Sequence, residues 1–366
     1  MAKKTPKNTA TKIDFESSPS ATDKVSEFKS RATVKMHGVD NSQTYEHPAS
    51  FAATTKELDP NSLKHFVKHV DIKVKKMDKD EIVFDLIGAE PPLANALRRI
   101  MIAEIPTIAI EKVTMWQNTS IIPDENLAHR MGLIPIKADA RLFENHTAGE
   151  EYTETDSLNF RLHKICTKKD PSAPMILNNT HDEEKLYNNS NVFSGDLEWV
   201  PKGDQAKRLG NIRPLHDDIL IAKLRPGQEI EMELICEKGI GKTHSKWSPV
   251  CTAFYRLLPD IRVEGITGDD AQDLKKICPM GVFDIEDIGG SATAVVKDAR
   301  ACTTCRECLR HPQFEGKVNV GKRKDIFEFH VESLGIFTPA EIVTQSLDTL
   351  KQKVHYWMDI LENQEL

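Results

Sequence analysis

The sequence predicts an α+β fold, and three observations support this class. Apolar and polar residues alternate over residues 72–86 around a polar turn, as in a β-hairpin with one buried face. Apolar residues then recur at helical spacing over residues 91–105. The same order returns near the C-terminus, where a strand pattern at 325–331 precedes a long helical pattern from residue 339. A hairpin followed by a helix favours a sheet with helices on one face.

The first helix is expected to begin at Pro91, because proline fits the first turn, where an N–H has no partner to lose. Pro106 is expected to end it. Its apolar residues fall at positions i, i+4, i+7 and i+8 and form one stripe, composed of Leu93, Leu97, Ile100 and Met101. Arg98 and Arg99 share the other side. Taken alone, the pattern is that of an amphipathic helix packed on its own sheet.

The last helix has a stronger signal. Thr338 fits the N-cap, Pro339 the first helical position and Glu341 the third position of a capping box. One apolar stripe then continues for about six turns. It consists of Val343, Leu347, Leu350, Val354 and Leu361, with Trp357 and Met358 beside it. A small sheet needs less apolar helix than this, so the stripe is expected to pack against a partner's helix.

The remaining segments differ in composition. Residues 1–65 are rich in Ser, Thr, Lys and Asp, so they are expected to form a disordered tail that cannot offset its chain entropy. Residues 119–260 hold short alternating segments between polar loops, which predicts a β-rich domain. The glycines at 239–242 superficially resemble a phosphate loop, but their spacing is wrong and no helix follows.

Size, charge and cysteine content exclude several classes. The 366 residues suffice for two domains. With 49 Lys+Arg against 56 Asp+Glu, the net charge of −7 argues against a protein that coats nucleic acid. Neither a secretory signal nor a run of ~18 apolar residues occurs, so no membrane association is expected. Seven cysteines, an odd number, favour a reducing compartment over a disulfide framework.

Four cysteines have the spacing of a metal site. Cys302, Cys305 and Cys308 form C-x₂-C-x₂-C, which wraps one face of a [4Fe–4S] cluster in bacterial-type ferredoxins. Cys278, followed by proline, is the expected fourth ligand. A four-thiolate zinc site is an alternative, although zinc more often uses two C-x₂-C pairs. A fold that keeps the thiols without a metal is the third possibility. The other cysteines are expected to be ordinary buried thiols: Cys166, Cys236 and Cys251.

A longer string, residues 90–144, resembles a known family. It contains N-A-L-R-R-I at 95–100, E-I-P-T at 104–107 and A-H-R-M-G-L-I-P at 128–135. These segments resemble the dimerisation motif of the alpha-type assembly subunits of RNA polymerases, among them the bacterial alpha protein and its archaeal counterpart. The end of the string is most similar to the members that eukaryotic RNA polymerases I and III share. A G-I-G-K-T-H-S-K-W-S-P loop at 239–249 is also similar, and in the family this loop contacts neighbouring subunits.

The resemblance implies a discontinuous organisation. An alpha-type dimerisation domain, a sheet plus two helices, is expected at 66–118 plus 318–366. A β-rich domain is inserted at 119–317, and within it residues 262–317 form a ferredoxin-like subdomain with the four cysteines. Archaeal members similar to this pattern can hold a cluster there, whereas many eukaryotic members have lost ligands.

The function implied by the resemblance is a non-catalytic scaffold of RNA polymerases I and III. It pairs with a smaller alpha-like subunit and then nucleates assembly of the large catalytic subunits for rRNA and small-RNA transcription. Nucleic acid is contacted only through the complex, and the site of action is the nucleus, in nucleolus and nucleoplasm, after assembly in the cytoplasm. The expected dimer interface consists of Leu93, Leu97, Arg98, Arg99, Ile100, Met101, Leu347, Leu350 and Val354. The two arginines are expected to orient the pair through carboxylates.

The sequence offers no catalytic constellation to set against this function. It lacks the D-x-D-x-D triad of a polymerase active site and any Ser/His/Asp or Cys/His arrangement in a catalytic context. The alternative from another class is a single-cluster, ferredoxin-like electron carrier. Only one short stretch carries that motif, in a chain dominated by assembly-type features.

Overall fold

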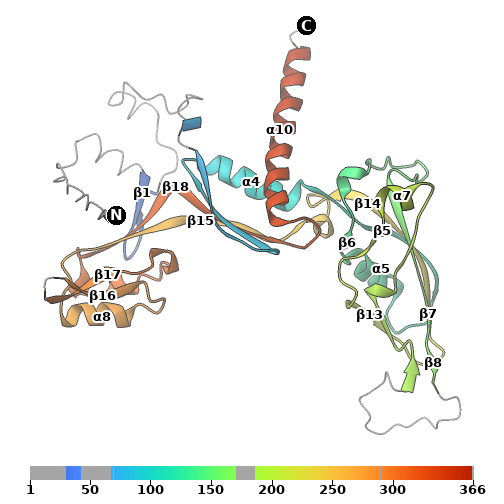
Figure 1. Ribbon diagram of the computed structural model, residues 1–366, viewed down its shortest axis with the longest axis horizontal. Coiled ribbons are helices and arrows are strands. Elements are labelled where there is room, and N and C mark those ends of the chain that lie inside the picture. Colours follow the sequence, from blue (N-terminus) through green and yellow to red (C-terminus); the bar gives the residue numbers. More distant parts are fainter. Residues whose placement is uncertain (1–29, 43–66, 69, 170–185, 289, 365–366) are drawn as a thin grey trace, which may run out of the picture. The chain divides into compact units, whose positions relative to one another are not determined.

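The computed structural model describes residues 30–42, 67–68, 70–169, 186–288 and 290–364 (Figure 1). They divide into two compact units. The larger unit comprises Ser62–Arg256 with Phe327–Leu366, and the cysteine unit comprises Met1–Asn61 with Leu257–Ile326. Two paired strands pass through both units: β15 (Val250–Val263) and β18 (Val318–Ser333).

The larger unit contains the predicted hairpin, β3 (Asp71–Met77) and β4 (Glu81–Ile87), in which Val74 pairs with Phe84. Strand β4 lies between β3 and β18 and is buried over residues 82–86. Strand β3 is exposed along its whole length and β4 is buried on both faces, so the prediction of one buried face is wrong for both strands. The reason is position, because β3 is the edge strand and has a neighbour on one side only.

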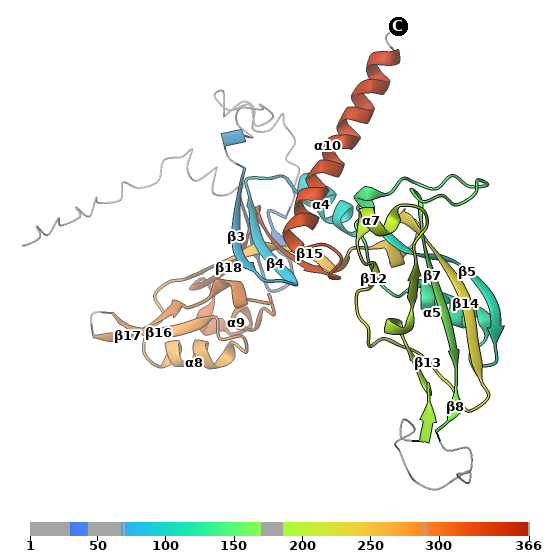
Figure 2. The ribbon, with the colours of Figure 1, turned by 45° about the vertical axis from the view of Figure 1, so that its right-hand side comes forward.

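Both predicted helices of this domain are present: α4 (Pro91–Ala103) and α10 (Pro339–Gln364). They pack on each other, and the Lys353 ammonium of α10 bonds the Glu104 carboxylate after α4 at 2.8 Å. The capping box is formed, since the Thr338 N–H donates to Glu341 Oε2 at 2.9 Å and the Glu341 N–H to Thr338 Oγ1 at 3.3 Å. Figures 1 and 2 show α10 extending well past its crossing with α4. Within the described residues, no helix combines the length and apolar character required to cross a membrane.

A four-stranded antiparallel sheet dominates the β-rich part, in the order β11-β7-β14-β5. Its strands are β5 (Pro106–Asn118), β7 (Ser157–Ile165), β11 (Glu198–Val200) and β14 (Glu229–Ile240). Three small sheets pair β6 (Ile136–Lys137) with β12 (Arg213–Pro214), β8 (Thr167–Lys168) with β9 (Tyr187–Asn188), and β10 (Asn191–Phe193) with β13 (Leu220–Lys223). The helices are α5 (Asp124–Gly132) and α7 (Gln205–Leu209), with single turns η1 (Ala140–Leu142), η2 (Ser194–Asp196) and η3 (Ser245–Trp247).

The structure moves one predicted boundary. Residues 106–118 were expected in the dimerisation domain, yet β5 pairs with β14 from Pro106 to Asn118 and belongs to the β-rich sheet. The helices and this sheet also fall in one compact unit instead of two. Local alternation marks a strand but does not select its partner, which is decided by the long-range register.

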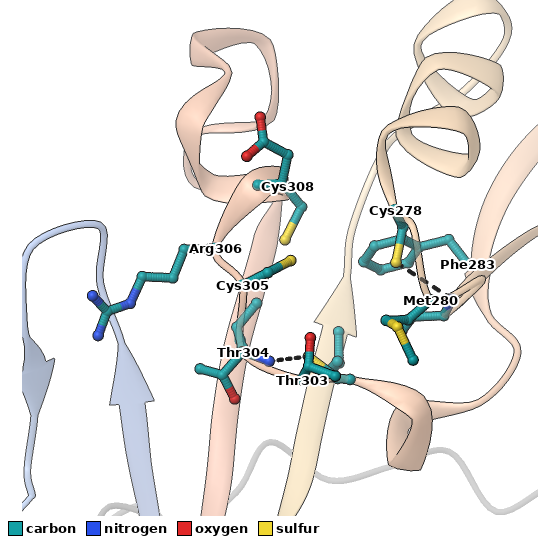
Figure 3. A pocket seen from close by; sticks show the side chains of 13 residues that line it. Cys278, Met280, Phe283, Thr303, Thr304, Cys305, Arg306 and Cys308 are labelled. Atoms are coloured by element: carbon teal, nitrogen blue, oxygen red, sulfur yellow. Dashed lines mark hydrogen bonds between the residues drawn. The ribbon is translucent and has the colours of Figure 1, made fainter.

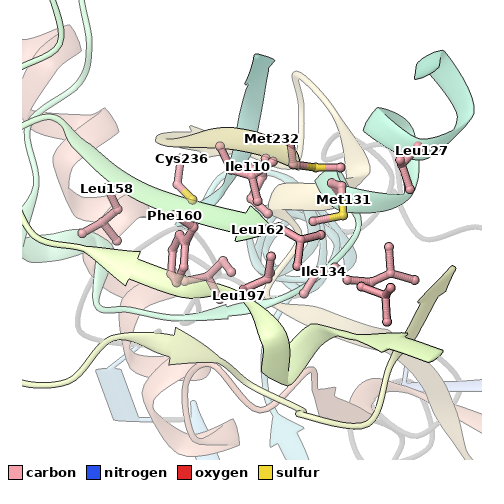
Figure 4. Close-up of a cluster of buried hydrophobic side chains, with 14 of the residues drawn as sticks. Ile110, Leu127, Met131, Ile134, Leu158, Phe160, Leu162, Leu197, Met232 and Cys236 are labelled. Carbon is pink, nitrogen blue, oxygen red and sulfur yellow. The ribbon is translucent and has the colours of Figure 1, made fainter. Parts of the chain in front are cut away.

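The core of the β-rich part lies on one face of this sheet (Figure 4). Ile110, Phe160 and Met232 point inward from three neighbouring strands, and Leu127 and Met131 of α5 cover them. Of the three cysteines expected to be buried, Cys166 and Cys236 are, whereas Cys251 is exposed on β15. That expectation is therefore wrong for Cys251, which lies beside the exposed Thr252 near the start of β15.

The cysteine unit adds strands from the N-terminal region: β1 (Arg31–Val34) and β2 (Val39–Asp40). Its other elements are α8 (Asp269–Ile277), β16 (Phe283–Ile288), β17 (Ser291–Val296), η4 (Ala299–Ala301), α9 (Glu307–Arg310) and η5 (Pro312–Phe314). The tail prediction is wrong for residues 30–42, since β1 pairs with β18 and the buried Arg31 bonds Asp260 at 2.6 Å. Composition did not reveal this strand because its burial comes from a partner about 290 residues away in the chain. The rest of the predicted tail, up to residue 65, lies outside the described residues.

Candidate dimerisation face and metal site

The apolar stripe of α4 is buried within the larger unit. Leu97, Ile100 and Met101 are buried, and Leu93 is half-buried. These residues, expected at a subunit interface, therefore pack on the chain's own core. The simpler alternative, an amphipathic helix covering its own sheet, describes α4 better.

The two arginines of α4 differ from each other. Arg98 is half-buried, and its guanidinium donates to Asn95 Oδ1 one turn earlier at 2.9 Å. Arg99 is exposed. Because its guanidinium lies in solvent, Arg99 is the better placed of the two to meet a carboxylate on another subunit.

Helix α10 has two faces with different surroundings. Ile342 and Ser346 are buried against the larger unit, and Leu350 is half-buried. A second face remains in solvent and carries large apolar side chains with these exposed fractions: Leu347 43%, Val354 51%, Trp357 60%, Met358 48% and Leu361 61%. At 100° per residue, positions 347, 354, 358 and 361 fall within an arc of about 60°, and position 357 flanks it. The structure thus leaves an apolar stripe on α10 uncovered.

The two sequence motifs of the β-rich part meet at one cavity. The C-terminal part of α5 with the following Leu133, and residues 243–247 of the loop before β15, line a cavity of about 470 Å³ that opens to solvent. Lys246 of the loop binds β5: its ammonium donates to the Ile110 carbonyl at 2.8 Å and to the Glu111 carboxylate, and lies 4.4 Å from the Trp247 ring centroid. The motifs are far apart in sequence, and the fold brings them to one surface.

Glycine is required at two positions of this loop by close packing. A Cβ on Gly239 would lie 2.4 Å from the Trp247 ring, and one on Gly241 would lie 2.4 Å from the Ile102 carbonyl oxygen. Both distances are shorter than any real contact of a Cβ atom. The G-x-G spacing therefore serves packing here, which agrees with the prediction that it is not a nucleotide loop.

The four predicted cysteine ligands line a single pocket of the cysteine unit (Figure 3). Cys278 ends α8, and Cys302, Cys305 and Cys308 follow one another from η4 into α9. Backbone N–H groups donate to two of the sulfurs: Val282 to Cys278 Sγ at 3.5 Å and Thr304 to Cys302 Sγ at 3.4 Å. The structure therefore brings together all four residues that the sequence singled out.

Two of the four thiols, those of Cys302 and Cys308, have pKa values raised by burial. Burial raises the pKa of Cys302 above its ordinary value, and it raises the pKa of Cys308 to about 11. Neighbouring cysteines add to both shifts, because thiolates repel one another. A bound cation would have to displace these protons.

The donor set, four thiols, suits either an iron–sulfur cluster or a zinc ion in its chemistry. Tetrahedral zinc with Zn–S bonds near 2.3 Å places its sulfurs about 3.8 Å apart. Among the described residues, no three of the cysteine sulfurs lie within 4.8 Å of one another. The cavity between the side chains is about 20 Å³, roughly the room of one water molecule, so a cluster would require the loop at 302–308 to move outward.

Comparison with known proteins extends over most of the chain. Residues 83–354 match the family model described as the RNA polymerase Rpb3/Rpb11 dimerisation domain. The chain is 42% identical over 346 residues to subunit RPAC1 of DNA-directed RNA polymerases I and III from Mus musculus, covering 93% of this chain and 98% of the relative. It is 42% identical over 330 residues to the protein of that name from Saccharomyces cerevisiae, covering 88% and 96%. Subunit rpb3 of RNA polymerase II from Dictyostelium discoideum is 30% identical over 304 residues, covering 80% and 95%.

Proposed function

The chain belongs to the RNA polymerase Rpb3/Rpb11 dimerisation domain family, and from that membership we propose that it is a non-catalytic scaffold subunit of DNA-directed RNA polymerases I and III. The relatives named for polymerases I and III are 41–42% identical, against 30% for the polymerase II subunit from Dictyostelium discoideum, which favours the shared I and III role. Similarity to polymerase subunits over nearly the whole chain removes the single-cluster electron carrier as an alternative.

The uncovered apolar stripe of α10 is the observation that carries the assembly role. Val354, Met358 and Leu361 project from the C-terminal half of α10, whereas its buried residues, Ile342 and Ser346, lie in its first turns. An amphipathic helix from a smaller alpha-like subunit would cover this stripe. Leu97, Ile100 and Met101 of α4 are buried within the chain, so the proposed interface shifts from them to the exposed residues of α10.

The experiment is co-expression of the full-length chain with the smaller alpha-like subunit, followed by affinity capture. Val354→Glu and Leu361→Glu should each reduce recovery of the partner, because a carboxylate cannot be buried unpaired in an apolar interface. Tyr356→Glu is the matched control, since Tyr356 is 61% exposed and lies on the other side of the same helix. Equal recovery with all three variants would show that this stripe is not the interface.

We further propose that the cavity between α5 and the 239–249 loop contacts the large catalytic subunits. It offers a mixed surface, with the exposed apolar side chain of Leu133 beside exposed His129 and His244. Leu133→Asp should leave capture of the small partner intact and reduce recovery of the large subunits. If the large subunits are recovered in unchanged amounts, another surface holds them.

We propose that Cys278, Cys302, Cys305 and Cys308 hold one [4Fe–4S] cluster, with zinc as the alternative occupant. The cluster would supply a cross-link between α8 and the 302–308 loop and a sensitivity of assembly to oxygen and iron supply. Anaerobic purification of the full-length chain should give about four irons and matching sulfide per chain. Cys305→Ser should lower both and weaken partner capture, with Cys251→Ser as the control. Stoichiometric zinc in place of iron would reverse the assignment, and unchanged capture would remove the regulatory role.

The place of action follows from the same proposal. Polymerase I and III subunits work in the nucleus, so the chain would act in nucleolus and nucleoplasm after assembly of the complex in the cytoplasm. Contact with nucleic acid would occur only through the assembled polymerase, in agreement with the net charge of −7. A fluorescent fusion that stays cytoplasmic when the small partner is depleted, and becomes nuclear when it is restored, is the expected behaviour.

A further inference from the structure

The outer face of the β11-β7-β14-β5 sheet carries a row of ionisable side chains that the assembly role does not use. On β14, Ile230, Met232 and Leu234 are buried in the core, so the alternate residues point to the opposite face. Those alternate residues are all acidic: Glu229, Glu231 and Glu233. Strand β7 contributes Arg161 and His163 to the same face, as the cross-strand register shows.

Three of these side chains converge. The register places His163 directly opposite Glu231, and Glu229 lies two residues earlier on the same strand and face. The His163 Nε2 atom is 2.9 Å from Glu229 Oε1. One ligand atom from each of the three residues lies within 4.8 Å of the other two, and no other three His, Cys, Asp or Glu residues in the described part of the chain meet this condition.

This donor set suits a divalent transition metal. Zinc takes His nitrogen and carboxylate oxygen at 2.0–2.2 Å, so its tetrahedral ligand atoms lie about 3.4 Å apart. Starting from 4.8 Å or less, small side-chain rotations bring the three atoms to that separation. Because the ligands stand on paired strands, their backbones are already held in place. All three side chains are partly exposed, so an ion can reach them.

The existing contacts are compatible with a bound ion. Arg161 donates to Oε1 of Glu231 at 2.6 Å, which leaves the second oxygen of that carboxylate for a metal. Glu229 and Glu231 bring two carboxylates to the cluster and Arg161 brings one guanidinium, so the carboxylate charge exceeds the guanidinium charge. A cation held by His163, Glu229 and Glu231 would balance that charge while Arg161 orients Glu231 from behind.

We propose that His163, Glu229 and Glu231 form a Zn²⁺ site on the outer face of the sheet, with water in the remaining coordination position. The site is separate from the four-cysteine pocket, which lies in the other unit. It does not depend on the scaffold function, because neither α10 nor the cavity at α5 contributes a ligand.

The test is a titration of the full-length chain with Zn²⁺ alone, followed by calorimetry and by the ¹⁵N signals of labelled histidine. The variants are Glu229→Gln, which removes a ligand charge, and Glu233→Gln, which changes the next outward residue of β14 and no ligand. The four-cysteine pocket is the same in each protein, so any difference between variants reports this site. Substitution of a residue that hydrogen-bonds to a metal ligand lowers the metal affinity by about 10- to 100-fold. Substitution of a ligand itself should therefore lower the affinity by at least about 10-fold.

The unaltered chain and Glu233→Gln are expected to bind one equivalent of Zn²⁺ at this site. Glu229→Gln is expected to bind that equivalent at least about tenfold more weakly. The His163 ring signal, identified by its absence in His163→Ala, should shift as that equivalent binds. Identical binding by Glu229→Gln and Glu233→Gln would overturn the proposal. So would a His163 signal that stays in place while zinc is taken up.

Discussion

The exposed stripe of α10 allows a quantitative prediction. Val354 and Leu361 are 51% and 61% exposed, so roughly half of each side chain remains to be covered by a partner. Full burial of such a side chain is worth about 1.5–3 kcal/mol, which leaves about 0.75–1.5 kcal/mol for each at the interface. The double substitution Val354→Ala/Leu361→Ala should therefore cost about 1.5–3 kcal/mol of binding free energy, or about 10- to 150-fold in Kd.

Calorimetry or biolayer interferometry with the purified small partner measures this loss directly. Alanine is the best helix former, so α10 itself should keep its structure, and circular dichroism of the chain alone checks this point. Tyr356→Ala removes a similarly exposed side chain from the other side of the helix and should leave Kd within about twofold, because a surface substitution outside the interface changes the free energy by less than about 0.5 kcal/mol. A double variant that binds like the unaltered chain, or a Tyr356→Ala variant that binds as weakly as the double one, would refute the assigned face.

Two further predictions concern stability. Gly239→Ala should lower the melting temperature of the chain by an amount equivalent to about 1–3 kcal/mol, because its Cβ would overlap the Trp247 ring, whereas Gly38→Ala has open space and should be neutral. The pKa of Glu341 is held below its ordinary value by hydrogen bonds from Thr338, chiefly from the backbone N–H. A carboxyl group whose pKa is lowered in the folded state stabilises the folded chain at pH values above its unfolded-state pKa. The contribution of Glu341 should therefore be present at neutral pH and disappear as the pH falls through the acidic range. Glu341→Gln should flatten that part of the pH dependence in thermal unfolding, and an unchanged profile would show that the cap does not stabilise α10.

Much of the local structure could be predicted from the sequence. Alternation located β3 and β4, the two prolines and helical spacing located α4, and the Thr338–Glu341 capping box located the start of α10. These signals depend on residues within a few positions of one another, so they can be recognised from the sequence alone. The C-x₂-C-x₂-C spacing likewise singled out the residues that the fold gathers with Cys278 into one pocket.

Other features required partners distant in the chain. The strand β1 was missed because its stability comes from pairing with β18 and from Arg31 binding Asp260, both far away in sequence. The cluster of His163 with Glu229 and Glu231 has no motif at all, since a cross-strand register about 70 residues apart creates it. Sequence spacing carries no information about which strand will lie beside which.

Helices α4 and α10 differ in what their sequences determine and what the tertiary structure determines. The amino-acid sequence by itself determined that each is an amphipathic helix with one apolar stripe, because side-chain spacing along a helix sets that pattern. The tertiary structure decided that Leu97, Ile100 and Met101 fill the chain's own core while Val354 and Leu361 remain in solvent. An apolar stripe lowers the free energy wherever it is covered, so periodicity predicts that a covering surface exists. Whether that surface belongs to the same chain or to another subunit depends on how the sheet and the second helix are placed.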